Sequence, residues 1–558
     1  MSTRAFSVAH RAADLADATG GVLDVLVVGL GATGAGVALD AASRGFTVAA
    51  VDMGDLASGT SSKSSKLIHG GLRYLENYEF GLVHEGVTER QLLQRLAPHL
   101  VRPMDFVYPV WPDTARRRLL GIGMTTYDVF AGVRNVRRHD RITAEQAIEL
   151  APALERSGCA YAYLYGDCAT DDARLVLAVT RQARRFGAIV LTYAEVTGLL
   201  FDGERIVGAQ LTDRLSGERC EIRARYVVNA TGVWVDRLLG MAEPGRAPMV
   251  QPSKGVHLVV PRDRLPLDAA SVLLPSRQGD ARSMFAIAWG HQTILGTTDT
   301  AYDGPLDGLG LTEADVEYVL AAGNAVFDRG LAPDDVVGAW AGVRPLLRGD
   351  GSDAMGDLSR RHTLLDPGTG LLTITGGKLT TYRRMARDVV DRLVHADGRR
   401  ARCRTEEIPL GLSRPFEPFR DEIVEAARSL GLSEAVGKLL VRQQGEAAAD
   451  VLSLVAGDEA AGRPRARPVS PAADHIFAEV LYAAREEGAA TLDDVFSRRM
   501  RLSLRARDAA LPAAAEAAGI LAGEIGRDAA WAAAQVASYA AAVRAERGVL
   551  GLAADAAA

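Results

Sequence analysis

The chain has 558 residues, 48% of them hydrophobic and 24% charged, and a formal net charge of -6 at pH 7. Its length exceeds one ordinary hydrophobic core, so we expect about two to four domains. The acidic balance argues against general binding to nucleic acid, and an anionic ligand would need a local cluster of basic residues. Four scattered cysteines predict no metal site, and the lack of ~18 successive apolar residues argues against a membrane-spanning helix.

The first predicted unit is a strand, turn, helix and strand between residues 22 and 52. The apolar run LDVLVVG leads into Gly29, Gly31 and Gly34, which form a G-x-G-x-x-G turn, and Asp52 ends the second strand. In such a unit the helix N-terminus can face a pyrophosphate, and the acid can accept hydrogen bonds from an adenosine ribose. A glycine-rich turn without a ligand is the alternative, but the order of strand, helix and acid favours nucleotide binding.

Further strands and helices are expected along the rest of the chain. Short β-branched or alternating runs predict strands at residues 188–192, 206–211, 226–229, 257–260, 285–289, 293–295 and 371–375. Beyond about residue 400, apolar residues recur three and four positions apart, which predicts helices within 422–430, 476–484 and 528–545.

Two glycine-containing turns follow predicted strands and favour FAD over NAD. The first consists of Ala230, Thr231 and Gly232 and resembles the turn that flavoproteins bring against their dinucleotide. The second offers backbone N–H groups and hydroxyls to an anionic part of a cofactor, through Gly376, Gly377, Lys378, Leu379 and Thr380.

These patterns predict an α/β protein with a discontinuous Rossmann-type FAD-binding domain. That domain is expected to comprise residues 22–100, 165–250 and 340–398. A mixed α+β substrate or cap domain would comprise 101–164 and 251–339, and a helical C-terminal domain 399–558.

Several long motifs resemble the flavin-dependent glycerol-3-phosphate dehydrogenases. The longest is SSKSSKLIHGGLRYLENYEFGLVHEGVTER, and shorter matches are HLVRPMDFVYPV, DDARLVL, NATGVWV, KGVHLVVP, LGTTDT, GVRPLL and GGKLTTYR. The resemblance is strong from about residue 22 to 390 and weaker beyond. Leu30 and Val233 depart from the family pattern, and Cys403 is the one cysteine in a region that is cysteine-rich in the anaerobic members. The aerobic, quinone-reducing branch is therefore the nearer match.

The resemblance implies oxidation of sn-glycerol 3-phosphate to dihydroxyacetone phosphate by hydride transfer to FAD. By analogy, Arg344 contacts the substrate oxygens and His69 lies in a segment over the flavin. An arginine fork can hold an alkoxide-like oxygen, and a histidine can take the hydroxyl proton. A salt-bridged arginine and a core histidine are the alternatives.

The same resemblance implies further contacts. The expected substrate-binding residues are Arg73, Tyr74, Lys254, His257, Arg360 and Lys378. For Lys254 and His257, which share a predicted strand, structural and functional interpretations remain equally open. The expected cofactor contacts from the longest motif are Ser62, Ser65, Lys66 and Leu67.

A basic stretch with an apolar centre spans residues 111–141. It contains Arg116, Arg117, Arg118, Arg134, Arg137, Arg138 and Arg141. Such a stretch is typical of a segment lying on an anionic membrane surface, and Leu119, Leu120, Ile122 and Phe130 would then enter the lipid. A solvated charge run is the alternative. The resemblance implies a quinone acceptor and a cytoplasmic protein attached peripherally to the inner face of the cell membrane; a homodimer is left open.

Other functions compete with this interpretation. A glycerol-3-phosphate oxidase would use O2, and flavin oxidases of amines or amino acids would share the nucleotide domain. The basic set of expected substrate residues disfavours the latter, whose substrates carry no phosphate. A non-catalytic flavin-binding protein would leave these polar residues unexplained.

Overall fold

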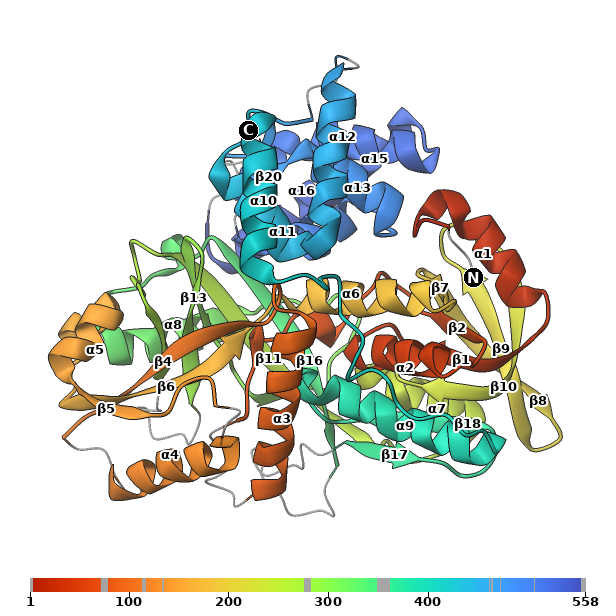
Figure 1. Ribbon diagram of the computed structural model, residues 1–558, viewed down its shortest axis with the longest axis horizontal. Coiled ribbons are helices and arrows are strands. Elements are labelled where there is room, and N and C mark those ends of the chain that lie inside the picture. The colour runs from red at the N-terminus through yellow and green to blue at the C-terminus, as the bar shows by residue number, and fades with distance from the viewer. Residues whose placement is uncertain are drawn as a thin grey trace.

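The computed structural model describes residues 4–71, 79–112, 117–132, 135–274, 283–348, 362–460, 462, 465–471, 473–505 and 507–552. Figure 1 shows a helix-covered sheet on the right, a second sheet on the left and a bundle of helices above both. No helix in these ranges is both long and apolar enough to cross a bilayer.

The first sheet has a parallel centre in the order β18-β10-β1-β2-β7. Its strands are β1 (Val22–Val28), β2 (Val48–Val51), β7 (Ile189–Leu191), β8 (Ala194–Asp202), β9 (Arg205–Asp213), β10 (Arg219–Asn229), β17 (Thr363–Leu365) and β18 (Leu371–Thr375). The helices around it are α1 (Arg11–Thr19), α2 (Ala32–Ser43), α6 (Asp172–Arg185), α7 (Val235–Ala242) and α9 (Tyr382–Asp397).

Burial on both faces explains the continuous apolar sequence of β1. Val25 and Val27 pack in one core with α2, α6 and α9, while Leu26 and Val28 pack in another with β9 and α7. A strand buried on both faces has no polar side, as is usual in parallel sheets. Because β1, β10 and β18 run parallel, their carboxyl ends and the turns that follow meet at one edge.

The second sheet runs in the order β15-β11-β14-β13-β12-β4-β6-β3, with β16 paired to β11 and β5 to β6. Its strands are β3 (Leu67–Ile68), β4 (Arg102–Val110), β5 (Asp140–Thr143), β6 (Tyr161–Ala169), β11 (Val250–Pro261), β12 (Ala270–Leu274), β13 (Met284–Trp289), β14 (Gln292–Gly296), β15 (Thr300–Ala301) and β16 (Gly338–Leu347). Its helices are α3 (Phe80–Leu96), α4 (Arg117–Ala131), α5 (Ala144–Leu150) and α8 (Glu313–Phe327).

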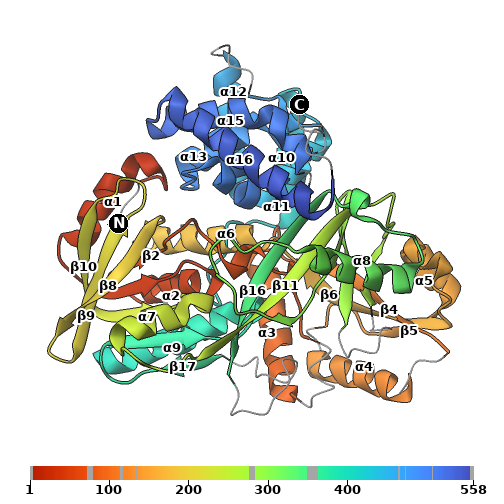
Figure 2. The ribbon, with the colours of Figure 1, turned by 180° about the vertical axis from the view of Figure 1, so that it is seen from behind.

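The last part of the chain is helical and has its own two cores. It contains α10 (Phe416–Ser429), α11 (Glu434–Gln444), α12 (Ala448–Ala460), α13 (Phe477–Glu486), α14 (Leu502–Arg505), α15 (Ala514–Ile525) and α16 (Ala529–Val549), with a small hairpin of β19 (Pro468–Ser470) and β20 (Ala473–Ile476). Figures 1 and 2, from opposite sides, show this bundle above α6 of the first sheet. Elements of the bundle contact α6 and β16, so it touches both sheets.

The predicted fold class is confirmed by these features. The strands expected at 188–192, 206–211, 226–229 and 371–375 belong to the first sheet, and the helices expected in the last third are present. The predicted boundary at residue 340 falls inside β16, which hydrogen-bonds to β11 of the second sheet. An apolar strand pattern does not reveal which sheet a strand joins, so the sequence could not place that boundary.

Candidate active site

A cavity of about 350 Å³ lies where β1, β10 and β18 end. It extends from the first sheet to strands β11 and β16 of the second. Its wall combines segments far apart in the sequence, including Gly29, Asp52, Ser65, Thr231, His257, Arg344 and Lys378. The edge of an α/β sheet at the carboxyl ends of its strands is the usual place for a bound nucleotide.

The turn between β1 and α2 exposes backbone to this cavity. Gly29 has a φ of 100°, and a Cβ on it would lie 2.6 Å from the carbonyl oxygen of Ala230. A Cβ on Gly34 would lie 1.8 Å from the carbonyl oxygen of Gly29, so α2 packs directly on the turn. Gly31 is the N-cap of α2 and has no side chain to accept from the first N–H groups. Ala32 N donates to Ser61 Oγ at 2.9 Å, and the N–H groups that follow it in the first turn suit the pyrophosphate of a dinucleotide.

Asp52 holds the same turn from the end of β2. Its Oδ2 accepts a hydrogen bond from Leu30 N at 2.7 Å, and its Oδ1 accepts one from Gly54 N at 2.9 Å. Burial raises its pKa to about 6, although it keeps some surface toward the cavity. A carboxylate has acceptor sites beyond these two, so it can still bind ribose hydroxyls.

The two other glycine turns line the cavity as well. Gly232, after β10, and Gly377, after β18, have φ values of 61° and 71°. A Cβ on Gly377 would lie 2.4 Å from Met385 Sδ, so the turn is closely packed against α9. Thr380 Oγ1 accepts a hydrogen bond from His69 N at 3.2 Å, which ties this turn to the segment after β3.

Arg344, on β16, reaches the cavity from the second sheet. Its Nη1 donates to the carbonyl oxygen of Thr298 and to Asp299 Oδ1, both at 3.2 Å, and its Nη2 donates to Thr297 Oγ1 at 3.0 Å. A Cβ on Gly255, on the neighbouring strand β11, would lie 2.6 Å from Thr297 Oγ1 and 2.7 Å from Nη2. The guanidinium is thus held in one position, and Gly255 leaves the room that it occupies.

His257, on β11, lines the cavity in an uncharged form. Its Nε2 lies 2.8 Å from Ser65 Oγ, and its ring stacks on Trp340 with centroids 4.9 Å apart. Burial, followed by the charges of Arg344 and Lys66, holds its pKa well below the usual value. An imidazole in these surroundings is a poor site for a proton but a good neutral hydrogen-bond partner.

Comparison with known proteins agrees with this geometry. Residues 24–383 match the family model described as FAD dependent oxidoreductase, and residues 403–532 match the C-terminal domain of alpha-glycerophosphate oxidase. Glycerol-3-phosphate dehydrogenase 2 of Mycobacterium tuberculosis is 40% identical over 525 residues, covering 94% of this chain and 88% of the relative. The aerobic glycerol-3-phosphate dehydrogenase of Bacillus subtilis is 36% identical over 513 residues, covering 89% and 90%.

The chain belongs to the FAD-dependent glycerol-3-phosphate dehydrogenases. The glycerol-3-phosphate dehydrogenase from Bacillus halodurans, solved in complex with FAD, superposes with a TM-score of 0.79 at 30% identity, with 99% of each chain covered. The predictions of the family, of the fold class and of FAD as cofactor are confirmed.

The structure of this family member brings most expected site residues to the cavity but not all. Gly29, Gly31, Asp52, Ser65, Leu67, His69, His257, Arg344 and the residues of the two other glycine turns line it. Gly34 supports the turn from behind. Arg73, Tyr74 and Arg360 lie outside the described residues.

Three expected residues point elsewhere. Lys254 Nζ lies 2.6 Å from Asp315 of α8, so it makes an ion pair away from the cavity. Lys66 is buried, and its Nζ lies 3.2 Å from Asp172. Ser62 is also buried, and its carbonyl oxygen accepts from Lys66 Nζ at 3.1 Å. In each case the motif indicated the segment, but for the two lysines the side-chain direction follows tertiary ion pairs that a motif does not show.

Ser61 and Gly255 are among the contributors to the site that were not predicted from the sequence. Ser61 Oγ accepts from Ala32 N at 2.9 Å, at the start of α2. Gly255 provides space for the Arg344 guanidinium. A glycine inside a strand often marks such a close approach, and this signal was available in KGVHLVVP.

Proposed function

We propose that the protein oxidises sn-glycerol 3-phosphate to dihydroxyacetone phosphate, with FAD as hydride acceptor and a quinone as final electron acceptor. The observation that carries the proposal is that Arg344 and Lys378 line the same cavity as the turns suited to FAD. A phosphorylated alcohol needs cations beside the flavin, whereas an amine or amino acid does not need a phosphate site. The names of relatives that align with nearly the whole chain support the same substrate.

Bound FAD would supply the hydride-accepting ring, and the protein would orient the alcohol and remove its proton. Arg344 would hold the substrate hydroxyl oxygen and stabilise negative charge as the proton leaves. Its contacts with Asp299 and the Thr297–Thr298 segment fix the fork in advance. Lys378 would bind the phosphate, together with Arg73, Tyr74 and Arg360.

His69 is the proposed proton acceptor. Both His69 and His257 line the cavity. Burial, and after it the charge of Arg344, lowers the pKa of His257, so that imidazole would act as a neutral hydrogen-bond partner through Ser65. His69→Gln should then slow flavin reduction and flatten its pH profile, whereas His257→Gln should slow it and keep the profile's shape.

Two observations support a membrane quinone as the electron acceptor: the exposed surface of α4, and the similarity of the chain to an aerobic glycerol-3-phosphate dehydrogenase. Ile122 and Val129 are 62% and 73% exposed and lie seven residues apart on one helix face. Exposed apolar side chains on one face suit the lipid boundary in which quinones dissolve. Attachment to the inner face of the cell membrane is part of this proposal.

Anaerobic mixing of the yellow protein with single substrates tests the reaction. Glycerol 3-phosphate should bleach the flavin absorbance, while glycerol and an amino acid should not. Bleaching by the amino acid, or none by glycerol 3-phosphate, would contradict the proposed substrate. Faster reoxidation of the reduced flavin by O2 than by a soluble quinone would favour the oxidase alternative.

A further inference from the structure

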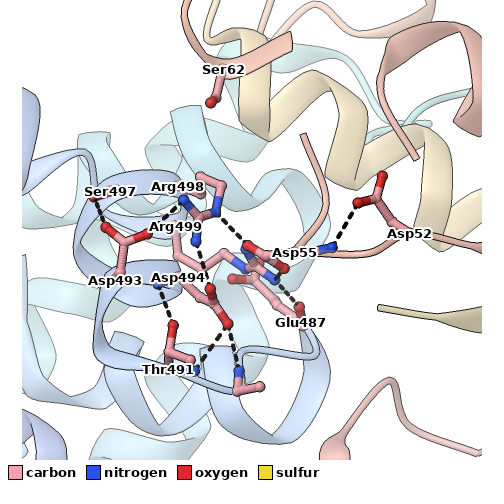
Figure 3. Close-up of polar contacts among 12 residues, drawn as sticks. Asp52, Asp55, Ser62, Glu487, Thr491, Asp493, Asp494, Ser497, Arg498 and Arg499 are labelled. Carbon is pink, nitrogen blue, oxygen red and sulfur yellow. Dashed lines mark hydrogen bonds and ion pairs between the residues drawn. The ribbon is translucent and has the colours of Figure 1, made fainter. Parts of the chain in front are cut away.

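Three buried arginines of the C-terminal part reach the loops beside the FAD cavity. Arg498 and Arg499 lie in the π-helix η10 (Asp494–Arg499), and Arg501 follows it. Their exposed fractions are 9%, 3% and 1%. Figure 3 shows Arg498 and Arg499 directed from this segment toward Asp55, on the same loop as Asp52.

Asp55 is held by two of these arginines at once. Its Oδ2 accepts from Arg498 Nε at 2.6 Å, and its Oδ1 accepts from Arg499 Nη2 at 2.9 Å. Asp493 and Asp494 pair with Arg498 from its other side at 2.8 and 2.5 Å. The Asp55 side chain is fully buried, so removing a partner would leave an uncompensated charge.

The Asp55 loop in turn holds the glycine turn after β1. Asp52 accepts from Leu30 N at 2.7 Å, and Ala57 N donates to the Leu30 carbonyl oxygen at 3.1 Å. Both backbone polar groups of Leu30, which lies between Gly29 and Gly31, are therefore fixed by the loop that the arginines anchor.

Arg501 fixes a second part of the cavity wall. It pairs with Asp171 at 2.9 Å and with Asp172 at the start of α6. Asp172 Oδ2 accepts from Ser64 N at 3.0 Å and from Ser64 Oγ at 2.7 Å, and Asp172 Oδ1 lies 3.2 Å from Lys66 Nζ. Ser64 lines the cavity, so this network connects the C-terminal part to the segment before β3.

Backbone strain gathers at the same interface. Among the described residues, five non-glycine residues have positive φ, and four of them lie here: Ala57, Lys66, Tyr193 and Arg501, at 57°, 58°, 54° and 64°. Tyr193 N donates to the Gly54 carbonyl oxygen at 2.8 Å, and its hydroxyl donates to Asp494 at 2.6 Å. Such conformations persist where the surroundings fix them, and they cluster at functional sites.

We propose that Arg498, Arg499 and Arg501 are positioning residues for FAD: they hold the Asp52–Ala57 loop and the Ser62–Lys66 segment in the conformation that binds the cofactor. The C-terminal helical part would then complete a cofactor site to which it contributes no lining residue among those described. If this interface served only to hold the C-terminal part against the first sheet, its arginines would not need to pair with residues of the cofactor loops.

Arg499→Lys tests the proposal with its charge kept. A lysine cannot reproduce the fork that donates to both Asp55 oxygens and to the Glu487 carbonyl oxygen. The matched control is Arg507→Lys, which weakens another buried ion pair of the C-terminal part, with Glu546 at 2.9 Å, and its contact with the carbonyl oxygen of Val336 just before β16. We would measure FAD release by flavin fluorescence, FAD titration of the apoprotein, and thermal unfolding of the apoprotein.

FAD release should be about tenfold faster in Arg499→Lys and within about twofold of the parent in Arg507→Lys; at an unchanged association rate, tenfold faster release corresponds to one decade in affinity. The apoprotein midpoints of the two variants should fall by similar amounts. If both variants release FAD alike, the arginines only dock the domains, and the proposal is wrong. If Arg499→Lys gives no soluble protein, Arg501→Lys is compared with the control instead, since Arg501 pairs with Asp172. The same two outcomes then support or contradict the proposal.

Discussion

At the scale of single residues, the position of Arg344 depends on the absence of a side chain at Gly255. The guanidinium donates to Thr297 Oγ1, and a Cβ on Gly255 would lie 2.6 Å from that oxygen and 2.7 Å from Nη2. The end of an arginine can move away from an added methyl group without unfolding the strand. It would then leave the position from which it reaches the cavity.

Gly255→Ala should therefore keep the fold and lose activity. A misplacement of about 1 Å can cost about 100-fold in rate, and we expect a loss of that order in flavin reduction by glycerol 3-phosphate. Gly240→Ala in α7 is the control, since no atom lies within 4 Å of its added Cβ. Stopped-flow reduction rates and FAD content would be compared. An unchanged rate in Gly255→Ala would show that Arg344 tolerates displacement.

Asp52 makes FAD binding sensitive to pH. Burial raises its pKa to about 6, two backbone N–H groups oppose the shift, and Asp55 adds to it while Arg214 opposes it. Asp55 itself stays ionised, since Arg499 and Arg498 outweigh burial and hold its pKa below the usual value. Asp52 is thus ionised above about pH 6 and protonated below it.

The apoprotein should bind FAD more weakly as pH falls through 6, because the protonated carboxyl loses acceptor capacity. Since only the ionised form binds in this scheme, the dissociation constant should rise about fivefold between pH 6 and pH 5. In Asp52→Asn the affinity should be lower at neutral pH and nearly independent of pH across this range. Equal pH dependence in both proteins would assign the titration to another group.

At the scale of elements, α4 shows what a sequence pattern can and cannot indicate. The basic stretch predicted an amphipathic segment, and a helix is present. The predicted lipid-facing set was wrong in part: Leu120 packs against an aromatic cluster, and Phe130 stacks on Phe80 at 5.4 Å. Ile122 is exposed, as lipid contact would require, and so is Val129, which was not in the predicted set. The charge pattern indicates a surface segment, but which of its side chains stay uncovered depends on the neighbouring helix and sheet.

The same limit explains the other differences from the sequence predictions. The glycine turns and Asp52 were predictable because the spacing of these residues along the sequence determines where they lie relative to the strands and helices around them. Lys254 and Lys66 lie in the expected segments, yet Asp315 and Asp172 turn them away from the cavity. Long-range ion pairs of this kind have no local sequence signal.

Changing Ile122 and Val129 together to glutamate should release the protein from anionic vesicles. Burying one such side chain is favourable by about 1.5 to 3 kcal/mol, so losing both should lower co-sedimentation by well over tenfold. Phe201→Glu in β8, which is 51% exposed on a different sheet, is the control and should bind like the parent. Flavin reduction by glycerol 3-phosphate should survive in both variants. Undiminished vesicle binding of the double variant would place any membrane contact elsewhere.

At the scale of the whole molecule, the C-terminal helices and the FAD loops share one buried ionic network. Asp55 joins Arg498 and Arg499, and Asp172 joins Arg501 to Lys66. Buried pairs of this kind contribute little net stability but are costly to break singly. Separating the helical part from the first sheet would expose several unpaired charges at once, so partial unfolding at this interface should be rare while FAD is bound.

Heating should accordingly release FAD and unfold the C-terminal helices in one transition. Flavin fluorescence reports release, and circular dichroism reports helix loss; the two midpoints should coincide. Because a ligand that binds only the folded state stabilises it by mass action, FAD at about 100 times its dissociation constant should add about 2.7 kcal/mol and move both midpoints upward together. If the helices melt first while the flavin stays bound and quenched, the C-terminal part does not hold the cofactor loops, and the coupling would have to be assigned to packing within the first sheet alone.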